Sequence, residues 1–388
     1  MEPRNLAILG STGSIGRQTL DIVADYPQKY RAYLITAGKN ADLLIEQAKQ
    51  FKPAYAIIAD DSLYGTVKDA LAGYPTEVLA GNEAIEQAMA IPEIDTVVTA
   101  MVGYSGLAPT IKAIKHGKKI ALANKETLVV AGELIYSLLQ QSESVLYPVD
   151  SEHGAIFQCL KGEKHEQVAK LILTASGGPF RTKSVDELKH VTIDDALNHP
   201  NWSMGKKITV DSATMMNKGF EVMEARWLFD MKPEQIEVVV HPQSIVHSMI
   251  EFVDGSVKAQ LGLPDMHIPI QYAISYPERL PSARPAMKLS DYANLTFEAP
   301  DLSKFPLLAF AYEAMQRGGN IPCALNAANE IAVDAFLRGA ISYNQIYQLI
   351  LNAVTHTDFD STPSYETYVQ TNMEVRQRTS ELLTSINF

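Results

Sequence analysis

A glycine-rich turn close to the start of the chain constrains the fold more than any other feature. Residues 6–9 form an apolar run typical of a buried strand, and Gly10-Ser11-Thr12-Gly13-Ser14-Ile15-Gly16 follows directly. A helical pattern comes next and stops at Pro27. Strand, glycine turn and helix in this order are the context of a dinucleotide-binding fingerprint, because glycines allow the pyrophosphate to approach the helix N-terminus. The spacing G-x-x-G-x-x-G is a variant of the usual form, and a purely structural turn is the alternative.

The end of the next expected strand indicates which dinucleotide is bound. Residues 33–36 have a strand pattern and lead into Ala37-Gly38-Lys39-Asn40. An NAD site usually has an acidic residue here to hold the ribose hydroxyls. This chain has a lysine and an asparagine instead, and a cation suits the 2′-phosphate of NADP. We therefore expect NADPH, although Lys39 could simply precede the helix expected over 41–50.

Strand and helix patterns continue to alternate up to residue 140. Strands are expected over 55–59, 95–102 and 119–123, and helices over 63–71, 83–90, 107–116 and 127–140. This alternation predicts a doubly wound α/β domain, in which ligands bind beyond the C-terminal ends of the strands. Asn124-Lys125-Glu126 follows one such strand, so Lys125 is a candidate for a cofactor or substrate contact. A surface lysine is the alternative.

Two carboxylates two residues apart, Asp150 and Glu152, follow the apolar run 144–147. If that run is a strand that extends through them, their side chains point to the same side. Two hard oxygen ligands directed at one point suit Mg²⁺ or Mn²⁺. An isolated pair of this kind is better explained as a solvated acidic loop, so the rest of the chain has to support the metal.

Two loops in the second half have side chains suited to an anion and to a lid. A strand over 171–175 leads into Ser176-Gly177-Gly178, which offers a hydroxyl and backbone N–H groups to an anion; a plain turn is the alternative. The loop His199-Pro200-Asn201-Trp202-Ser203-Met204-Gly205 carries large apolar side chains between polar residues. Such side chains either fill a gap in the core or belong to a lid that excludes water.

A helix expected from about residue 214 to 229 places Asn217, Lys218 and Glu221 on one face, because they are three and four residues apart. Ser212, Asn217 and Lys218 are donors suited to a phosphate. Glu221 would supply a third carboxylate to the metal. The alternative is a solvated helix start with an ordinary ion pair.

The remaining segments suggest a sheet and a helical C-terminal part. Strands over 237–240, 244–252 and 256–261 are expected in an antiparallel sheet, with Asp254-Gly255 as a hairpin turn. The proline-rich stretch 277–300 reads as a linker. Helices are expected over 307–316, 324–338, 343–355 and 364–384. The polar residues 326–330 in the second of these helices are expected to have a packing role.

Length and composition exclude several classes of protein. A chain of 388 residues with 46% hydrophobic and 20% charged residues is globular, with two or three domains. A net charge of −12 argues against nucleic-acid binding but leaves room for a small anionic substrate in a local basic pocket. Cys159 and Cys323 form no metal or disulfide pattern. The start of the sequence has no signal-peptide pattern, and the apolar runs are short for a membrane span. We therefore expect a cytoplasmic protein without a membrane partner.

Taken together and in order, these motifs make the chain similar to the 1-deoxy-D-xylulose 5-phosphate reductoisomerase family of the non-mevalonate isoprenoid pathway. The motifs that carry the resemblance lie at residues 10–16, 37–40, 122–126, 148–153, 175–180, 199–205 and 211–219. The resemblance covers nearly the whole chain and is weakest around residues 161–167 and in the C-terminal tail.

The resemblance implies which residues hold each ligand. The NADPH residues would be Thr12, Gly13, Ser14, Ile15, Gly38, Lys39, Asn40, Asn124, Glu126 and Gly205. The ligands of Mg²⁺ or Mn²⁺ would be Asp150, Glu152 and Glu221. The substrate residues would be Lys125, Ser151, Glu152, Ser176, His199, Trp202, Ser212, Asn217, Lys218 and Glu221. Lys125, Glu152 and His199 would be catalytic, and Trp202 and Met204 would belong to the lid.

The resemblance also implies an organisation and an activity. The fold would be a Rossmann-like NADPH domain over 1–149, an α+β catalytic and dimerisation domain over 150–276, a linker over 277–300 and an α-helical domain over 301–388. The family is a homodimer, and the strands after Glu237 are the candidate interface. The activity would be the metal-dependent rearrangement and NADPH-dependent reduction of a small sugar phosphate.

Two alternatives stay open at this point. Another NADP-dependent dehydrogenase of a phosphorylated metabolite, without isomerisation, would not need three metal carboxylates. A nucleotide-sensing regulator would bind NADPH without turning over any sugar phosphate.

Overall fold

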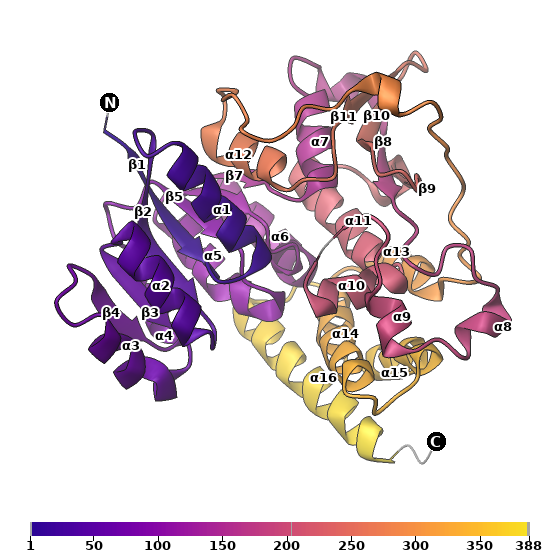
Figure 1. Cartoon of the computed structure of the whole chain (residues 1–388). Helices are drawn as coiled ribbons and strands as arrows, with labels where there is room; N and C mark the ends of the chain where they lie inside the picture. The colour runs from indigo at the N-terminus through magenta and orange to yellow at the C-terminus, as the bar shows by residue number, and fades with distance from the viewer. Residues whose placement is uncertain (1, 203, 386–388) are drawn as a thin grey trace. The chain divides into compact units, whose positions relative to one another are not determined.

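Seven parallel strands form the larger sheet, in the order β4-β3-β2-β1-β5-β6-β7 (Figure 1). Their bounds are Arg4–Leu9 (β1), Tyr30–Ala37 (β2), Tyr55–Ile58 (β3), Glu77–Ala80 (β4), Thr96–Thr99 (β5), Lys119–Leu122 (β6) and Val145–Pro148 (β7). In the computed structural model, which describes residues 2–202 and 204–385, Leu6 of β1 pairs with Ala32 on one side and Thr96 on the other. The strand order reverses beside β1, as in doubly wound folds, so the predicted fold class is confirmed. The short strand β4 was not predicted.

The helices that connect these strands agree with the predicted pattern. They are α1 (Ser14–Asp25), α2 (Ala41–Phe51), α3 (Tyr64–Ala70), α4 (Asn82–Ala88), α5 (Leu107–Lys115) and α6 (Glu126–Gln140). Helix α6 is kinked at Ala131. A later helix, α12 (His267–Ser275), packs on α1 and contributes Ile270 and Ile274 to the core of this sheet.

The smaller sheet has the order β11-β10-β8-β9. Its strands are β8 (Val168–Ala175), β9 (Ile236–Val240), β10 (Val246–Phe252) and β11 (Val257–Leu261). Strand β10 is antiparallel to β8 and β11, and Asp254-Gly255 forms the predicted hairpin turn. Strand β9 is parallel to β8, so the expectation of a purely antiparallel sheet is wrong. Several helices separate β8 from β9, and a connection of that length permits a parallel crossover.

Helices make up most of the remaining chain. They are α7 (Ser151–Cys159), α8 (Val185–Leu188), α9 (Ile193–Leu197), α10 (Lys206–Ala213), α11 (Met216–Phe229), α13 (Pro306–Arg317), α14 (Ile321–Leu337), α15 (Tyr343–Thr355) and α16 (Tyr365–Ser385). Short 3₁₀ turns lie at Asp61–Leu63, Gly103–Gly106, His165–Gln167, Pro233–Gln235 and Leu289–Asp291. The four predicted C-terminal helices are confirmed, whereas α10 was not predicted.

Helix α14 is buried on most sides, because α10, α13, α15 and α16 all pack against it. A helix in that position buries apolar side chains on most of its faces, and the buried Asn326 and Asn329 are exceptions in α14. Leu308 of α13, Leu325 of α14 and Ile350 of α15 share one core with Phe220 of α11. The C-terminal helices, coloured orange to yellow in Figure 1, therefore do not have a core separate from α11.

The contacts divide the chain into two units. One contains residues 1–124, 135–154 and 265–285, with the seven-stranded sheet, and the other contains residues 125–134, 155–264 and 286–388. The division into four parts stays a prediction.

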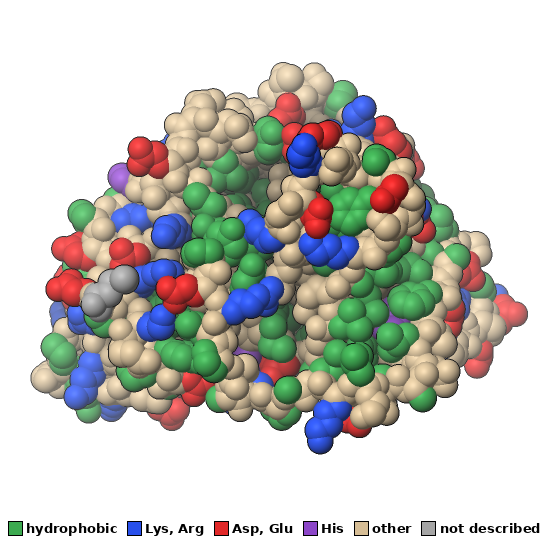
Figure 2. Space-filling view, turned by 90° about the horizontal axis from the view of Figure 1, so that it is seen from above, with side chains coloured by type: hydrophobic (Ala, Val, Ile, Leu, Met, Phe, Trp, Pro, Cys, Tyr) green, Lys and Arg blue, Asp and Glu red, His purple; other side chains and the backbone are tan. Residues whose placement is uncertain are grey.

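Among the described residues, no helix is both long and apolar enough to cross a membrane. On the face seen in Figure 2, acidic and basic side chains are interspersed.

Candidate active site

The glycine turn after β1 is sterically required. A Cβ atom on Gly16 would lie 2.3 Å from the carbonyl oxygen of Gly10, and one on Gly10, whose φ is +84°, would lie 2.7 Å from that of Ala100. Gly13 is the N-cap of α1 and no side chain caps the helix. The first N–H groups of α1 therefore remain available to a pyrophosphate.

Side chains from β2 and α2 hold this turn in place. The backbone N–H of Gly10 donates to the Thr36 hydroxyl at 2.9 Å. The Ser11 hydroxyl donates to Gln47 Oε1 at 2.7 Å, and Gln47 Nε2 donates to the Ser11 carbonyl at 2.9 Å. Gln47, which the sequence analysis did not single out, thus fixes the turn from a buried position.

The residues predicted for the 2′-phosphate lie in solvent at the end of β2. Gly38, Lys39 and Asn40 are all exposed. The Asn40 side chain accepts a hydrogen bond from the Leu43 N–H at 3.2 Å and caps α2. The Asn40 side chain is therefore occupied by the helix cap. The Lys39 ammonium is the charged group that remains for a phosphate.

Asn124, one of the predicted NADPH residues, is held by the loop that follows β5. It is fully buried, and its amide donates to the carbonyls of Met101 and Gly103, both at 2.9 Å. A Cβ atom on Gly106 would lie 2.5 Å from its Oδ1. In this conformation Asn124 shapes the loop after β5.

Asp150 and Glu152 do not lie on a strand, so the strand periodicity expected of them is wrong, but their carboxylate oxygens lie within 4.8 Å of each other, as two ligands directed at one point require. Strand β7 ends at Pro148, and α7 begins at Ser151. Asp150 Oδ1 accepts the Ser151 N–H at 2.9 Å, and the Asp150 carbonyl accepts the Gly154 N–H at 2.7 Å. The Ser151 hydroxyl donates to the Glu152 carboxylate. Both acids sit at a helix N-terminus, where the backbone stabilises negative charge.

Three predicted residues donate hydrogen bonds to the Glu221 carboxylate. Glu221 Oε1 accepts from Asn217 Nδ2 at 2.6 Å and from Lys125 Nζ at 3.2 Å, and its Oε2 accepts from Lys218 Nζ. Lys125 also donates to Asn217 Oδ1 at 3.0 Å. Lys125, Lys218 and Glu221 are all buried. Two ammonium groups therefore lie within hydrogen-bond distance of one carboxylate in the interior, where charged groups require partners.

The serine loop packs on the end of α10. Gly178 has φ +66°, and a Cβ atom there would lie 2.5 Å from the carbonyl oxygen of Ser212. The Gly178 N–H donates to the Ser176 hydroxyl at 3.1 Å. The two serines predicted for one phosphate are therefore brought to adjacent backbone segments, and α11 follows with no side-chain cap at its N-terminus.

His199 is held as a neutral donor. Its Nδ1 accepts the N–H groups of Asn201 and Trp202 at 3.2 and 3.0 Å, so the ring proton belongs on Nε2. Nε2 lies 3.0 Å from the Ser176 hydroxyl oxygen, to which it donates. Burial lowers the pKa of His199 to about 4. The ring is therefore uncharged at neutral pH and directs the Ser176 hydroxyl.

The predicted lid loop is attached beyond His199. Asn201 Nδ2 donates to the Pro242 carbonyl at 2.6 Å and to the Ser244 hydroxyl at 2.9 Å. The Trp202 ring lies 6.2 Å from that of His247. Gly205 is the N-cap of α10. Ser203 lies outside the described residues.

Glu126 lies in an ionic cluster that the sequence analysis missed. Its Oε1 accepts from Lys207 Nζ at 2.7 Å. Burial raises the pKa of Glu126, but the Lys207 ammonium outweighs it and the net shift is downward. Lys207 also pairs with Asp211 at 2.8 Å. Lys207 and Asp211 are four residues apart, and this helical spacing is the sequence feature from which their ion pair could have been predicted.

Comparison with known proteins decides the family. Models of the 1-deoxy-D-xylulose 5-phosphate reductoisomerase, of its C-terminal domain and of the DXP reductoisomerase C-terminal domain match residues 6–132, 146–229 and 261–378. The enzyme of that name from Bacteroides thetaiotaomicron is 55% identical over 380 residues, which cover 98% of this chain and 97% of the relative. The Chloroherpeton thalassium enzyme is 50% identical over 96% of this chain and 97% of its own.

The chain belongs to the 1-deoxy-D-xylulose 5-phosphate reductoisomerase family.

Solved reductoisomerases have the same fold. The Zymomonas mobilis enzyme in complex with NADPH superimposes with a TM-score of 0.92 at 42% identity, covering 99% of this chain and all of the other. A DOX-P reductoisomerase in complex with NADPH, fosmidomycin and magnesium also gives 0.92, at 40% identity and 98% coverage of both chains. The predicted family, fold and class of enzyme are thereby confirmed.

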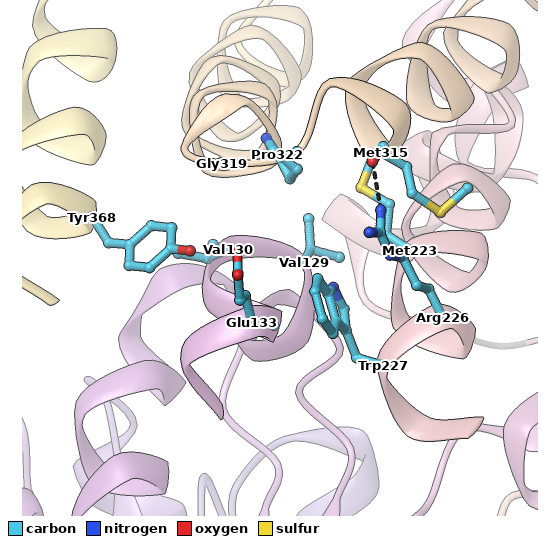
Figure 3. A pocket seen from close by; sticks show the side chains of 12 residues that line it. Val129, Val130, Glu133, Met223, Arg226, Trp227, Met315, Gly319, Pro322 and Tyr368 are labelled. Atoms are coloured by element: carbon cyan, nitrogen blue, oxygen red, sulfur yellow. Dashed lines mark hydrogen bonds between the residues drawn. The ribbon is translucent and has the colours of Figure 1, made fainter. Parts of the chain in front are cut away.

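One cavity lies apart from the predicted residues. It has a volume of about 40 Å³ and is lined by α6, α11, α13, α14 and α16 (Figure 3). Arg226 donates to the Met315 carbonyl at 2.7 Å along its wall. Trp227 packs so closely on Gly132 that a Cβ atom there would lie 2.1 Å from the indole. None of the predicted site residues lines this cavity.

Proposed function

We propose that this chain catalyses the NADPH- and divalent-metal-dependent rearrangement and reduction of 1-deoxy-D-xylulose 5-phosphate to 2-C-methyl-D-erythritol 4-phosphate. The reaction belongs to the non-mevalonate isoprenoid pathway. The observation that carries the proposal is the hydrogen-bonded cluster of Lys125, Asn217, Lys218 and Glu221 in a member of this family. It combines cations for an anionic substrate with a carboxylate for a metal.

The substrate phosphate is held by donors from three segments. Lys218 and Asn217 occupy the uncapped first turn of α11, where backbone N–H groups favour an anion. Ser212 supplies a hydroxyl from α10, and Ser176 a second hydroxyl directed by His199. Binding of the phosphate supplies energy for ordering the lid residues Trp202 and Met204.

Most residues of the proposed cofactor set lie in the other unit, whereas Glu126 and Gly205 lie in the unit of the phosphate residues. The pyrophosphate of NADPH binds at the N-terminus of α1 through residues 12–15, and Lys39 pairs with the 2′-phosphate. Gly38, Asn40, Asn124, Glu126 and Gly205 complete the cofactor set that the resemblance implies. The exposed ammonium of Lys39 fits NADPH better than NADH.

The donor set fits a hard divalent cation. Asp150, Glu152 and Glu221 would hold Mg²⁺ or Mn²⁺, because both metals prefer carboxylate oxygens. When bound, the metal would polarise the substrate carbonyl and lower the pKa of a neighbouring hydroxyl.

The chain's own groups move protons and balance charge. The Lys125 ammonium stabilises negative charge that develops on the substrate oxygens. Ser151, hydrogen-bonded to Glu152, orients a substrate hydroxyl, and Glu152 exchanges protons with it. The neutral His199 ring orients the phosphate end, and the lid keeps water from the reactive intermediate.

The chain forms a homodimer in this proposal, with the edge of the smaller sheet and strands β9 to β11 as the interface. Val257 on the edge strand β11 is half exposed, as an interface strand would require in one subunit. Cys159 and Cys323 are both free and buried, which suits the reducing cytoplasm where we place the enzyme.

The direct test is NADPH oxidation by the purified chain with 1-deoxy-D-xylulose 5-phosphate, with identification of a branched product. An unbranched reduced product would indicate a dehydrogenase without isomerisation. NADPH binding without any turnover would indicate a regulator.

A further inference from the structure

We propose that Lys207, Asp211 and Asn329 are positioning residues that set the Glu126 carboxylate and the C-terminal end of the lid loop. The inference rests on the proposed function for the roles of Glu126 and the lid. None of the three is among the predicted ligand-binding residues, and they act through neighbouring residues that are.

The three side chains form one continuous chain of polar contacts. Lys207 Nζ lies 2.7 Å from Glu126 Oε1 and 2.8 Å from Asp211 Oδ2. Asn329 Nδ2 donates to Asp211 Oδ1 at 2.8 Å. These contacts join α14 to α10 and α10 to the start of α6, all within one unit.

The burial of these groups makes the geometry strict. Asp211 and Asn329 are 1% and 0% exposed. The Lys207 ammonium serves two carboxylates and also lies 5.0 Å from the centre of the Phe220 ring. The buried Asp211 carboxylate has few alternative arrangements, because leaving a charge unpaired in the interior is unfavourable. The contacts therefore favour one relative placement of the three helices.

The residues of this cluster are close in sequence to predicted site residues, which gives the cluster a functional role. Lys207 follows the N-cap Gly205 by two residues, so fixing its ammonium fixes the end of the lid loop. Asp211 directly precedes Ser212 of the phosphate set. Glu126 directly follows Lys125, whose ammonium contacts Glu221. A displaced Asp211 would thus disturb the cofactor side and the phosphate side together.

Helix α14 provides a matched control. Asn326 lies one turn before Asn329 on the same helix and is also fully buried, but its amide donates to Glu330 at 2.9 Å and not to Asp211. Asn326→Ala and Asn329→Ala remove the same atoms from equivalent depths. Loss of stability alone should affect both variants alike.

The experiment compares the two variants in the intact chain. NADPH affinity is measured by fluorescence titration, kcat and KM by NADPH oxidation, and stability by urea unfolding. We expect Asn329→Ala to weaken NADPH binding about tenfold and to lower kcat/KM by a similar factor, as for other groups that orient a ligand-binding residue. We expect Asn326→Ala to change both by less than about twofold at comparable stability.

A second comparison tests whether Asn329 acts through Asp211. Asp211→Asn should have an effect on NADPH affinity at least as large as that of Asn329→Ala, and the double variant should be no worse than Asp211→Asn alone. Equal NADPH affinity and kcat/KM in Asn326→Ala and Asn329→Ala, or multiplying effects in the double variant, would overturn the proposal. Absence of turnover by the unaltered chain would instead count against the proposed function, and the NADPH titrations would still decide the positioning role.

Discussion

His199 Nε2 donates to the Ser176 hydroxyl at 3.0 Å while its Nδ1 accepts two backbone N–H groups. Every ring nitrogen is therefore used by the neutral form, and protonation of Nδ1 would break two hydrogen bonds. This agrees with the lowering of the His199 pKa to about 4 by burial.

The His199 geometry predicts a pH-dependent stability. The folded pKa of about 4 is below the usual value of 6.5, so the unfolded state binds more protons between these limits. The contribution of the neutral His199 ring to the unfolding free energy is therefore complete above pH 6.5 and is lost as the pH falls towards 4. We expect the difference in unfolding free energy between the unaltered chain and His199→Gln to shrink over that range. Urea titrations at several pH values measure it, and a constant difference would contradict the neutral ring.

Replacing Glu221 separates turnover from cofactor binding. Glu221→Gln removes a proposed metal ligand and leaves the residues of the glycine turn unchanged. We expect kcat to fall by at least about 100-fold, while the dissociation constant of NADPH stays within about threefold. Asp334→Asn, which removes an exposed carboxylate of α14, is the control and should change neither. Retained turnover in Glu221→Gln would remove Glu221 from the mechanism.

Lys39 should determine the choice of dinucleotide. Lys39→Ala removes the exposed cation at the end of β2, so the KM for NADPH should rise about tenfold while the KM for NADH changes little. Lys49→Ala removes another exposed lysine, on α2, and serves as the control. The account of the 2′-phosphate fails if both dinucleotides are affected equally.

Gly16 should tolerate no side chain. An alanine there would place Cβ 2.3 Å from the Gly10 carbonyl oxygen and distort the pyrophosphate turn. We expect Gly16→Ala to lower the unfolding free energy by about 2 kcal/mol or more and to weaken NADPH binding. Gly65, near the start of α3, has no atom within 4 Å of a built Cβ. Gly65→Ala should therefore be neutral or stabilising by about 0.5 kcal/mol, as thermal and urea unfolding will show.

The sequence predicted those parts of the molecule whose signal is local. Helices with sustained periodicity, such as α15 at Tyr343–Thr355, agree with their predicted bounds. The shared face of Asn217, Lys218 and Glu221 follows from helical spacing, and the structure brings these side chains together. The glycine turn could likewise be predicted, because its glycines are visible in the sequence and follow a strand directly.

Features that depend on distant contacts were not predictable. Strand β4 has only four residues, and its side chains are partly or fully exposed, so its apolar pattern is weak. Helix α10 contains a buried aspartate that a pattern of apolar residues does not reveal. Asp211 becomes buried only because Asn329, 118 residues later, and Lys207 provide its partners. The parallel pairing of β8 with β9 is likewise set by tertiary packing.

The most direct test of the central claim is NADPH oxidation with 1-deoxy-D-xylulose 5-phosphate, first in excess chelator and then after addition of Mg²⁺ or Mn²⁺. The proposed metal ligands Asp150, Glu152 and Glu221 predict no turnover in chelator, recovery with either metal and a branched product. Full turnover in excess chelator would contradict the assignment of Asp150, Glu152 and Glu221 to a metal.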